Sequence, residues 1–258
     1  PGTLKVITWP NYVEAAKDKE KYCAIYDAKG YVAAKENNQV GNTNFVMLDC
    51  FNDATSINDF TYLDDLANDA KVILCLSSTN VHAMPAVRRM FMELVERKID
   101  NPVVLIIDSN WQTADEHLIH YSTEAGALLL DGFGDGVCFG MTQESYHQLT
   151  VNSQQSTAGR NYSINTSNEQ FINSTAFSIL QATRTRISKT EYISCPSCGR
   201  TLFDLQETTA KIRNRTNHLK GVKIAIMGCI VNGPGEMADA DFGYVGSGVD
   251  KITLYKGR

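Results

Sequence analysis

The stretch Cys195-Pro196-Ser197-Cys198 places two thiols on one tight turn, and a third thiol follows thirty-one positions later at Cys229. That third thiol lies in the run Met227-Gly228-Cys229-Ile230-Val231-Asn232-Gly233-Pro234-Gly235-Glu236. A Cys-x-x-Cys pair can hold a metal centre from one turn, and a flexible Gly-Pro-Gly bend can bring a second loop to it. Glu236 follows Cys229 by seven positions, within reach around that bend. The sequence therefore predicts that this part of the chain folds around a site with three thiolate ligands and one carboxylate.

Three interpretations of these cysteines remain open from the pattern alone. Structural zinc is one, because Cys-x-x-Cys is half of a zinc ribbon. The usual second half is missing, since His218 has no partner at ligand spacing. Unrelated buried cysteines are the second. The third is a catalytic [4Fe–4S] cluster, in which one harder carboxylate ligand leaves one iron easier for an oxygen-bearing substrate to reach. The pattern favours the cluster, and the alternative from another class is a zinc-stapled, non-enzymatic scaffold or interaction module.

Three segments resemble one protein family, 4-hydroxy-3-methylbut-2-enyl diphosphate synthase. They are the run Met227 to Glu236, the run Ala238-Asp239-Ala240-Asp241-Phe242-Gly243-Tyr244-Val245-Gly246, and the run Thr190-Glu191-Tyr192-Ile193-Ser194-Cys195-Pro196-Ser197-Cys198-Gly199-Arg200-Thr201-Leu202-Phe203-Asp204-Leu205. The match is densest over Arg184 to Lys256. The resemblance implies that a [4Fe–4S] cluster has as its ligands Cys195, Cys198, Cys229 and Glu236. It also implies two catalytic residues, Glu236 as the ligand that yields and Asn232 as a residue that touches substrate.

The resemblance implies an iron–sulfur oxidoreductase. The family reductively opens 2-C-methyl-D-erythritol 2,4-cyclodiphosphate to 4-hydroxy-3-methylbut-2-enyl diphosphate in the non-mevalonate route of isoprenoid and terpenoid biosynthesis. The expected partners are therefore the cyclic diphosphate and an electron donor, ferredoxin or flavodoxin. The sequence leaves open whether two copies form a homodimer.

The resemblance also implies that the chain is a fragment. Family members begin with a (β/α)8 barrel that holds the cyclic diphosphate, and 258 residues starting at Pro1 leave no room for it. Longer forms carry a barrel-like insert before the cluster domain, and the first part of this sequence resembles that insert. We expect a barrel-like insert domain over 1–188, acting as a spacer, and a [4Fe–4S] domain over 189–258. Without the N-terminal barrel of the full-length enzyme, the fragment should be inactive.

Composition fits a soluble cytoplasmic protein, with 43% hydrophobic and 21% charged residues and a net charge of −5. No apolar stretch approaches the roughly 20 residues that a membrane helix needs. Basic residues are too few, and too little interleaved with aromatic residues, to indicate nucleic-acid binding. Seven cysteines, an odd number, do not suggest a disulfide framework. Four of them are expected to be reduced core residues: Cys23, Cys50, Cys75 and Cys138.

The first part of the chain alternates short apolar runs with polar helical segments, which predicts an α/β domain with a parallel sheet closed as an incomplete barrel. The expected strands are Leu4–Thr8, Tyr22–Tyr26, Asn44–Leu48, Lys71–Leu76, Val103–Ile107, Ala127–Leu130 and Val137–Phe139. The expected helices are Tyr12–Asp18, Asp59–Asn68, Ala83–Glu96, Ala114–Glu124 and Asn173–Ile187, with a long loop over Val151–Gln170.

The strand ends of this domain carry polar residues where a barrel has its catalytic loops. They are Asp49, Ser77-Ser78, Asp108 and the glycine-rich run Asp131-Gly132-Phe133-Gly134-Asp135-Gly136. The run lacks the Lys-Ser/Thr of a phosphate-binding P-loop, so we interpret it as a tight turn. His117 and His120 could both be metal ligands, but an exposed polar helix face is the preferred interpretation.

The second domain is expected to be a small α+β unit. Glu191–Ser194 should be a strand that leads into Cys195, and Thr201 should cap a helix that places both thiols of the Cys-x-x-Cys pair near its N-terminus. The remaining strands are expected at Val222–Met227, Phe242–Val245 and Lys251–Tyr255. Residues 189–258 hold ten Lys or Arg against seven Asp or Glu, which suits an anionic substrate and an acidic electron carrier as well as ordinary scatter of surface charge.

Overall fold

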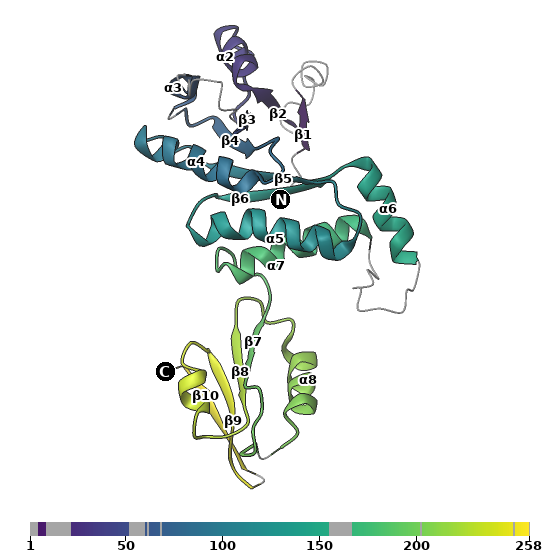
Figure 1. The fold of residues 1–258 in the computed structure, drawn as a ribbon. Helices are drawn as coiled ribbons and strands as arrows, with labels where there is room; N and C mark the ends of the chain where they lie inside the picture. The colour runs from purple at the N-terminus through teal and green to yellow at the C-terminus, as the bar shows by residue number, and fades with distance from the viewer. Residues whose placement is uncertain are drawn as a thin grey trace. The chain divides into compact units, whose positions relative to one another are not determined.

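The computed structural model describes residues 5–8, 22–51, 60, 62–67, 69–154, 167–201, 203–249 and 251–257. The chain divides into two compact units, Pro1–Ile179 and Leu180–Arg258. Each unit has its own sheet and its own buried residues (Figure 1). Within the described ranges, no helix is long and apolar enough to cross a membrane.

The first unit is built on one parallel sheet whose strands follow each other in chain order. Its strands are β1 (Lys5–Thr8), β2 (Tyr22–Asp27), β3 (Asn44–Asp49), β4 (Val72–Ser77), β5 (Val103–Ser109) and β6 (Gly136–Met141). Every neighbouring pair is parallel. Sequential order with parallel pairing is the arrangement of a β/α barrel, and β1 and β6 form the two edges of the described sheet. The expected barrel-like parallel β/α fold is confirmed.

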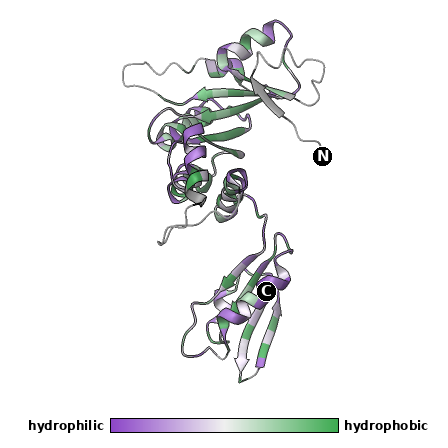
Figure 2. Cartoon of the chain, turned by 90° about the vertical axis from the view of Figure 1, so that its right-hand side faces the viewer, coloured by the Kyte–Doolittle hydropathy of each residue, from purple (hydrophilic) through white to green (hydrophobic). Residues whose placement is uncertain are grey.

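Six helices belong to this unit within the described ranges. They are α2 (Ala28–Glu36), α3 (Tyr62–Leu66), α4 (Ala83–Glu96), α5 (Ala114–Leu130), α6 (Gln143–Gln154) and α7 (Asn168–Ala182). Helices α2, α4 and α5 pack against strands of the sheet. Helix α4 buries an apolar stripe with the spacing of one helix face, at Val87, Met90, Phe91 and Leu94. Alternate residues of β3 and β5 are buried, as expected for strands with one well-covered face. Figure 1 shows α4 and α5 along the sheet, and Figure 2 shows that its strands are mainly apolar.

Several sequence predictions for this unit need correction. The run Ala127–Leu130 is the end of α5 and not a strand, because the capping box of Thr113 and Glu116 starts a helix that continues for 17 residues. A short apolar run cannot by itself distinguish a strand from a buried helix segment. Helices α2 and α6 were not expected. The prediction for Tyr12–Asp18 lies outside the described residues.

The cysteines of this unit follow the prediction with one exception. Cys23, Cys50 and Cys75 are buried, whereas Cys138 is exposed. Cys138 lies on β6, an edge of the described sheet, where no further strand shields it. The prediction that Cys138 is a core residue was therefore wrong.

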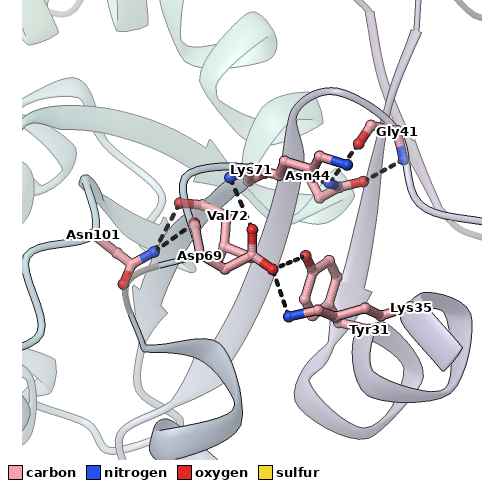
Figure 3. Close-up of polar contacts among 8 residues, drawn as sticks. All are labelled: Tyr31, Lys35, Gly41, Asn44, Asp69, Lys71, Val72 and Asn101. Carbon is pink, nitrogen blue, oxygen red and sulfur yellow. Dashed lines mark hydrogen bonds and ion pairs between the residues drawn. The ribbon is translucent and has the colours of Figure 1, made fainter.

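A polar network around Asp69 joins helix α2 to the loop that precedes β4 (Figure 3). The Asp69 carboxylate accepts a hydrogen bond of 2.9 Å from the hydroxyl of Tyr31 and lies 2.7 Å from Lys35 Nζ. It also accepts a bond of 3.1 Å from the backbone amide of Lys71. Burial opposes ionisation of the carboxyl, but these contacts outweigh burial and hold the pKa of Asp69 below its ordinary value. The Tyr31 side chain is fully buried, so Asp69 satisfies a donor that water does not reach.

Asp69→Ala should lower the free energy of unfolding at pH 7 by about 2–3 kcal/mol, because it leaves a buried hydroxyl without its partner. A lowered pKa stabilises the fold above the unfolded-state pKa, and this contribution disappears as the pH falls through the folded-state value. The difference between parent and variant should therefore shrink below about pH 4. Urea unfolding at pH 7 and pH 3 measures it. Asp65→Ala, at an exposed position of α3, is the matched control, and equal losses in the two variants would contradict the prediction.

The second unit is a small mixed sheet with one flanking helix, as expected. Its elements are β7 (Glu191–Ser194), α8 (Leu205–Thr216), β8 (Lys223–Met227), α9 (Gly233–Glu236), β9 (Phe242–Gly248) and β10 (Lys251–Lys256). The strand order is β10-β9-β8-β7, in which only the β9–β10 pair is antiparallel. The central strand β8 is buried on both faces: Met227 packs with Met237 and Val245, and Ile226 packs with Leu205 of α8. Central burial explains why β8 is a continuous apolar run.

Candidate functional site

The predicted ligands come together beyond the C-terminal ends of β7 and β8 in the second sheet. Cys195, Cys198, Cys229, Asn232 and Glu236 all line a hollow of about 130 Å³. The hollow is open, because Cys198, Asn232 and Glu236 are exposed and the other two are half-buried. In the part of the chain that the structure describes, no three His, Cys, Asp or Glu side chains stand where they could together hold one metal ion.

Parallel pairing of β7 with β8 brings the cysteine loops together. Ser194 pairs with Ile226 in the register, so the residues that follow β7 and β8 leave the sheet at the same end. The amide of Cys195 donates to the carbonyl of Ile226 at 3.4 Å, and the amide of Gly228 donates to Cys195 Sγ at 3.3 Å. The second contact joins the two cysteine loops directly.

Thr201 closes the Cys-x-x-Cys loop and does not cap a helix. Its hydroxyl accepts from the amide of Cys198 at 3.2 Å, and its own amide donates to the Cys198 carbonyl at 2.9 Å. Helix α8 begins at Leu205, where Asp204 is the N-cap and accepts from the amide of Glu207. The predicted cap was therefore wrong. Because the helix-dipole effect falls off within one turn, α8 does not explain thiolate formation at the Cys-x-x-Cys pair.

Backbone amides after Cys229 provide the stabilisation that the helix was expected to give. Hydrogen bonds from the amides of Asn232 and Val231 lower the pKa of the Cys229 thiol, and the positive charge of Arg200 and a contact with Cys198 lower it further. A lower pKa favours the thiolate, which is the form that binds metals. This part of the site is therefore prepared electrostatically for a cationic centre.

The short helix α9 places Asn232 and Glu236. Pro234 stands in its first turn, where a missing amide costs nothing, and the amide of Glu236 donates to the carbonyl of Asn232 at 3.0 Å. Buried Met237 anchors the helix end in the core. The Asn232 side chain makes no capping bond to the helix. Both polar side chains therefore face a solvent-accessible hollow from a fixed backbone.

Gly246 is a functional position that sequence reasoning missed. A Cβ atom there would lie 2.5 Å from the carbonyl oxygen of Gly228, so β9 and the loop that carries Cys229 touch backbone to backbone. A glycine inside a strand pattern often marks such a close approach, and this signal was present in the sequence.

Gly246→Ala should therefore push the Gly228 loop outward and lower the free energy of unfolding by about 1–3 kcal/mol. The rate of Cys229 alkylation should also change. Gly235→Ala is the matched control beside the same site, because a Cβ atom there meets nothing within 4 Å. Urea unfolding and timed alkylation measure both effects. Equal behaviour of the two variants would show that the contact between Gly246 and Gly228 does not hold the loop.

The polar strand ends of the first unit form a separate hollow of about 330 Å³. Ser77, Ser78 and Asp108 line it, together with Trp111 and His120. Asp49, in contrast, holds a loop: its carboxylate accepts from the amide of Thr79 at 3.2 Å and from the Thr79 hydroxyl at 3.1 Å. The structure thus brings the serines and Asp108 together and leaves Asp49 in a structural role.

The glycine-rich run is a tight turn, as interpreted from the sequence. Gly132 and Gly134 have φ values of 82° and 94°, which side chains other than glycine rarely adopt. The carboxylate of Asp135 accepts from the amide of Val103 at 2.9 Å and ties the turn to β5.

The histidines of α5 have separate partners. His117 is fully buried with its Nδ1 at 2.7 Å from the hydroxyl of Ser109, and burial lowers the pKa of His117. His120 Nε2 lies 3.1 Å from the backbone oxygen of Asp108. Placing both on an exposed polar face was therefore wrong for His117, whose side chain points into the core.

Comparison with known proteins covers both units. The family model described as GcpE protein C-terminal domain matches residues 191–258. The chain is 47% identical over 198 residues to 4-hydroxy-3-methylbut-2-en-1-yl diphosphate synthase (flavodoxin) of Parabacteroides distasonis, covering 76% of this chain and 28% of the relative. It is 47% identical over 196 residues to the chloroplastic synthase (ferredoxin) of Arabidopsis thaliana, covering 74% and 23%. It is 46% identical over 187 residues to the synthase (flavodoxin) of Protochlamydia amoebophila, covering 72% and 24%.

Two facts follow from these lengths. The chain spans about a quarter of the curated relatives it matches. The aligned share of this chain is far larger than residues 191–258 alone, so the likeness extends into the first unit.

Proposed function

Because the chain belongs to the 4-hydroxy-3-methylbut-2-en-1-yl diphosphate synthase family, we propose that it is the part of such an enzyme that holds the redox cofactor. The single observation that carries the proposal is the convergence of Cys195, Cys198, Cys229 and Glu236 on one hollow. In this proposal the cofactor is a [4Fe–4S] cluster with those four residues as its ligands. The first unit is the insert of the longer form and acts as a spacer.

The donor set and the volume of the hollow both suit a cluster. Three thiols and one carboxylate match iron–sulfur ligation with one weaker, harder donor. The hollow of about 130 Å³ exceeds the roughly 30 Å³ that one water molecule occupies in the liquid, so it offers room for several atoms. The lowered pKa of Cys229 favours the thiolate, which is the form that binds metals. These features support a polynuclear centre over a single zinc ion in a non-enzymatic scaffold.

We propose that the whole protein reductively opens 2-C-methyl-D-erythritol 2,4-cyclodiphosphate to 4-hydroxy-3-methylbut-2-enyl diphosphate. The relatives named for flavodoxin and ferredoxin support an electron-carrier protein as the reductant. In the whole protein, the substrate's diphosphate would bind to an N-terminal barrel. Cytoplasmic location and a homodimer remain predictions.

Each residue of the hollow has a task in this mechanism. The bound cluster would supply single electrons and Lewis-acid character. The amide of Gly228 holds the sulfur of Cys195 by a hydrogen bond, and the amides of Asn232 and Val231 favour the thiolate of Cys229. The exposed carboxylate of Glu236 is a ligand that the substrate could displace. The side-chain amide of Asn232 could donate a hydrogen bond to an oxygen of the substrate. Glu236 and Asn232 would therefore orient the substrate, whereas the three cysteines would stay bound to the cluster.

Anaerobic reconstitution tests the cofactor. The chain should bind about four iron and four sulfide per molecule and show a broad brown absorbance, as a cubane cluster requires. One tightly bound zinc without sulfide would replace the proposal with the zinc scaffold. The chain alone should not turn over the cyclic diphosphate, whereas the full-length protein should, because positioning by the barrel supplies much of the rate.

A further inference from the structure

A second, larger hollow opens beside the proposed cofactor site. It is a groove of about 840 Å³ between the loop that follows β7 and one stripe of α8. The loop contributes Ser194 to Ser197, and the helix contributes Gln206, Thr209, Ala210, Arg213 and Asn214. Phe203, held edge-on against Tyr244, also lines the groove. The groove is too wide and open to be explained by the cofactor ligands alone.

Cys195 is shared by the groove and the cofactor hollow. Of the four proposed ligands, it is the one that lines both, whereas Cys198, Cys229 and Glu236 line the cofactor hollow without lining the groove. Asn232 likewise belongs to the cofactor hollow. A molecule seated in the groove therefore lies against the Cys195 side of the ligand set. The residues proposed to meet the substrate are not part of that surface.

Two charged residues line the groove, Arg213 and Asp204. Asp204 lies at the start of α8, where its carboxylate is the N-cap and accepts from the amide of Glu207. The Glu207 carboxylate is paired with Lys211 at 2.6 Å. Arg213 is exposed and stacks on the ring of Tyr192 at 5.0 Å, and in the described part of the chain no carboxylate pairs with it. Residues 194–220, which supply the loop and the helix of the groove, hold five Lys or Arg against two Asp or Glu, so the exposed Arg213 lies in a segment of net positive charge.

Building on the function proposed above, we propose that this groove receives a small acidic electron-carrier protein, whose redox centre comes to lie over Cys195. Electron transfer becomes slower with distance, and here a single cysteine side chain separates the docked partner from the cofactor. A surface of net positive charge attracts an acidic partner and helps to fix its orientation. Each docking oxidises the carrier by one electron, so two successive dockings deliver the two electrons that ring opening consumes. Electrons enter at Cys195, and substrate meets the site at Glu236 and Asn232.

The test compares two reductants on the full-length protein. Arg213→Glu should raise the KM for the carrier protein by about tenfold at low ionic strength, because a charge at the docking surface is reversed, and salt should shrink the effect. Turnover driven by reduced methyl viologen, a small reductant that needs no docking surface, should be unchanged. Arg213→Lys should retain most of the parent's affinity for the carrier. Ala210→Trp should weaken carrier binding without changing any charge, because it fills the groove.

Lys251→Glu is the matched control, because it makes the same change of charge on β10, at the opposite edge of the sheet from β7. Equal effects of Arg213→Glu and Lys251→Glu on carrier affinity would overturn the docking site, as would an equal loss of viologen-driven turnover in Arg213→Glu. Calorimetric titration of the carrier into each variant gives the same ranking independently of turnover. Absence of viologen-driven turnover in the parent, with carrier binding still dependent on Arg213, would instead reject the proposed function and leave the docking site standing.

Discussion

Cys229→Ser is expected to remove most of the iron and sulfide from the anaerobically reconstituted chain. The amides of Asn232 and Val231 and the charge of Arg200 lower the pKa of the Cys229 thiol, so the fold favours its thiolate more than that of an ordinary cysteine. A serine hydroxyl stays largely protonated in the same place and is a poor iron ligand. Iron and sulfide content and the visible absorbance measure the loss. Cys195→Ser and Cys198→Ser should behave alike.

Cys138→Ser is the matched control for that experiment, because it removes an exposed thiol from the first unit. It should leave the iron and sulfide content unchanged. If Cys138→Ser lost as much iron as Cys229→Ser, the metal would be adsorbed at any accessible thiol. If Cys229→Ser kept its full complement, Cys229 would not be a ligand.

Glu236→Cys is expected to keep the iron but to lower turnover of the full-length enzyme by about 100-fold, which corresponds to roughly 2.7 kcal/mol. A fourth thiolate binds iron more strongly than a carboxylate does, so it resists displacement by the substrate oxygen. Glu236→Gln should lower both turnover and iron content, since a neutral amide is a weak iron ligand. The iron content should be kept in Glu236→Cys and lowered in Glu236→Gln. It therefore distinguishes a variant that lacks the fourth ligand from a variant whose fourth ligand the substrate cannot displace.

Iron analysis, electron paramagnetic resonance and turnover assays on these variants measure the outcome. Asp239→Asn is the control, because it removes a carboxylate from the same segment but does not line the hollow. A Glu236→Cys enzyme as fast as the parent would show that Glu236 is not the exchangeable ligand.

The β/α order of the first unit and the residues that line the candidate site could be predicted from the order of amino acids alone. Short apolar runs rich in β-branched residues, such as Val103–Ile107, favour a buried strand over a helix. The loops that carry Cys195 and Cys229 follow two such strands. Because these strands are parallel neighbours, both loops begin at the same end of the sheet. Spacing and residue type were therefore enough to group the four candidate ligands.

Which residues are buried, and which hollows the candidate ligands line, depends on how each unit packs. Cys138 and Cys75 stand in similar apolar runs, but Cys138 is exposed because it lies on an edge strand. The run Ala127–Leu130 continues α5 because the helix started at a distant capping box. Cys195 faces both the cofactor hollow and the groove, because α8 packs beside β7 at a distance that no local pattern encodes. Local sequence sets the preference of a segment, whereas exposure and hollows depend on neighbours that are remote in the chain and are fixed when the whole unit packs.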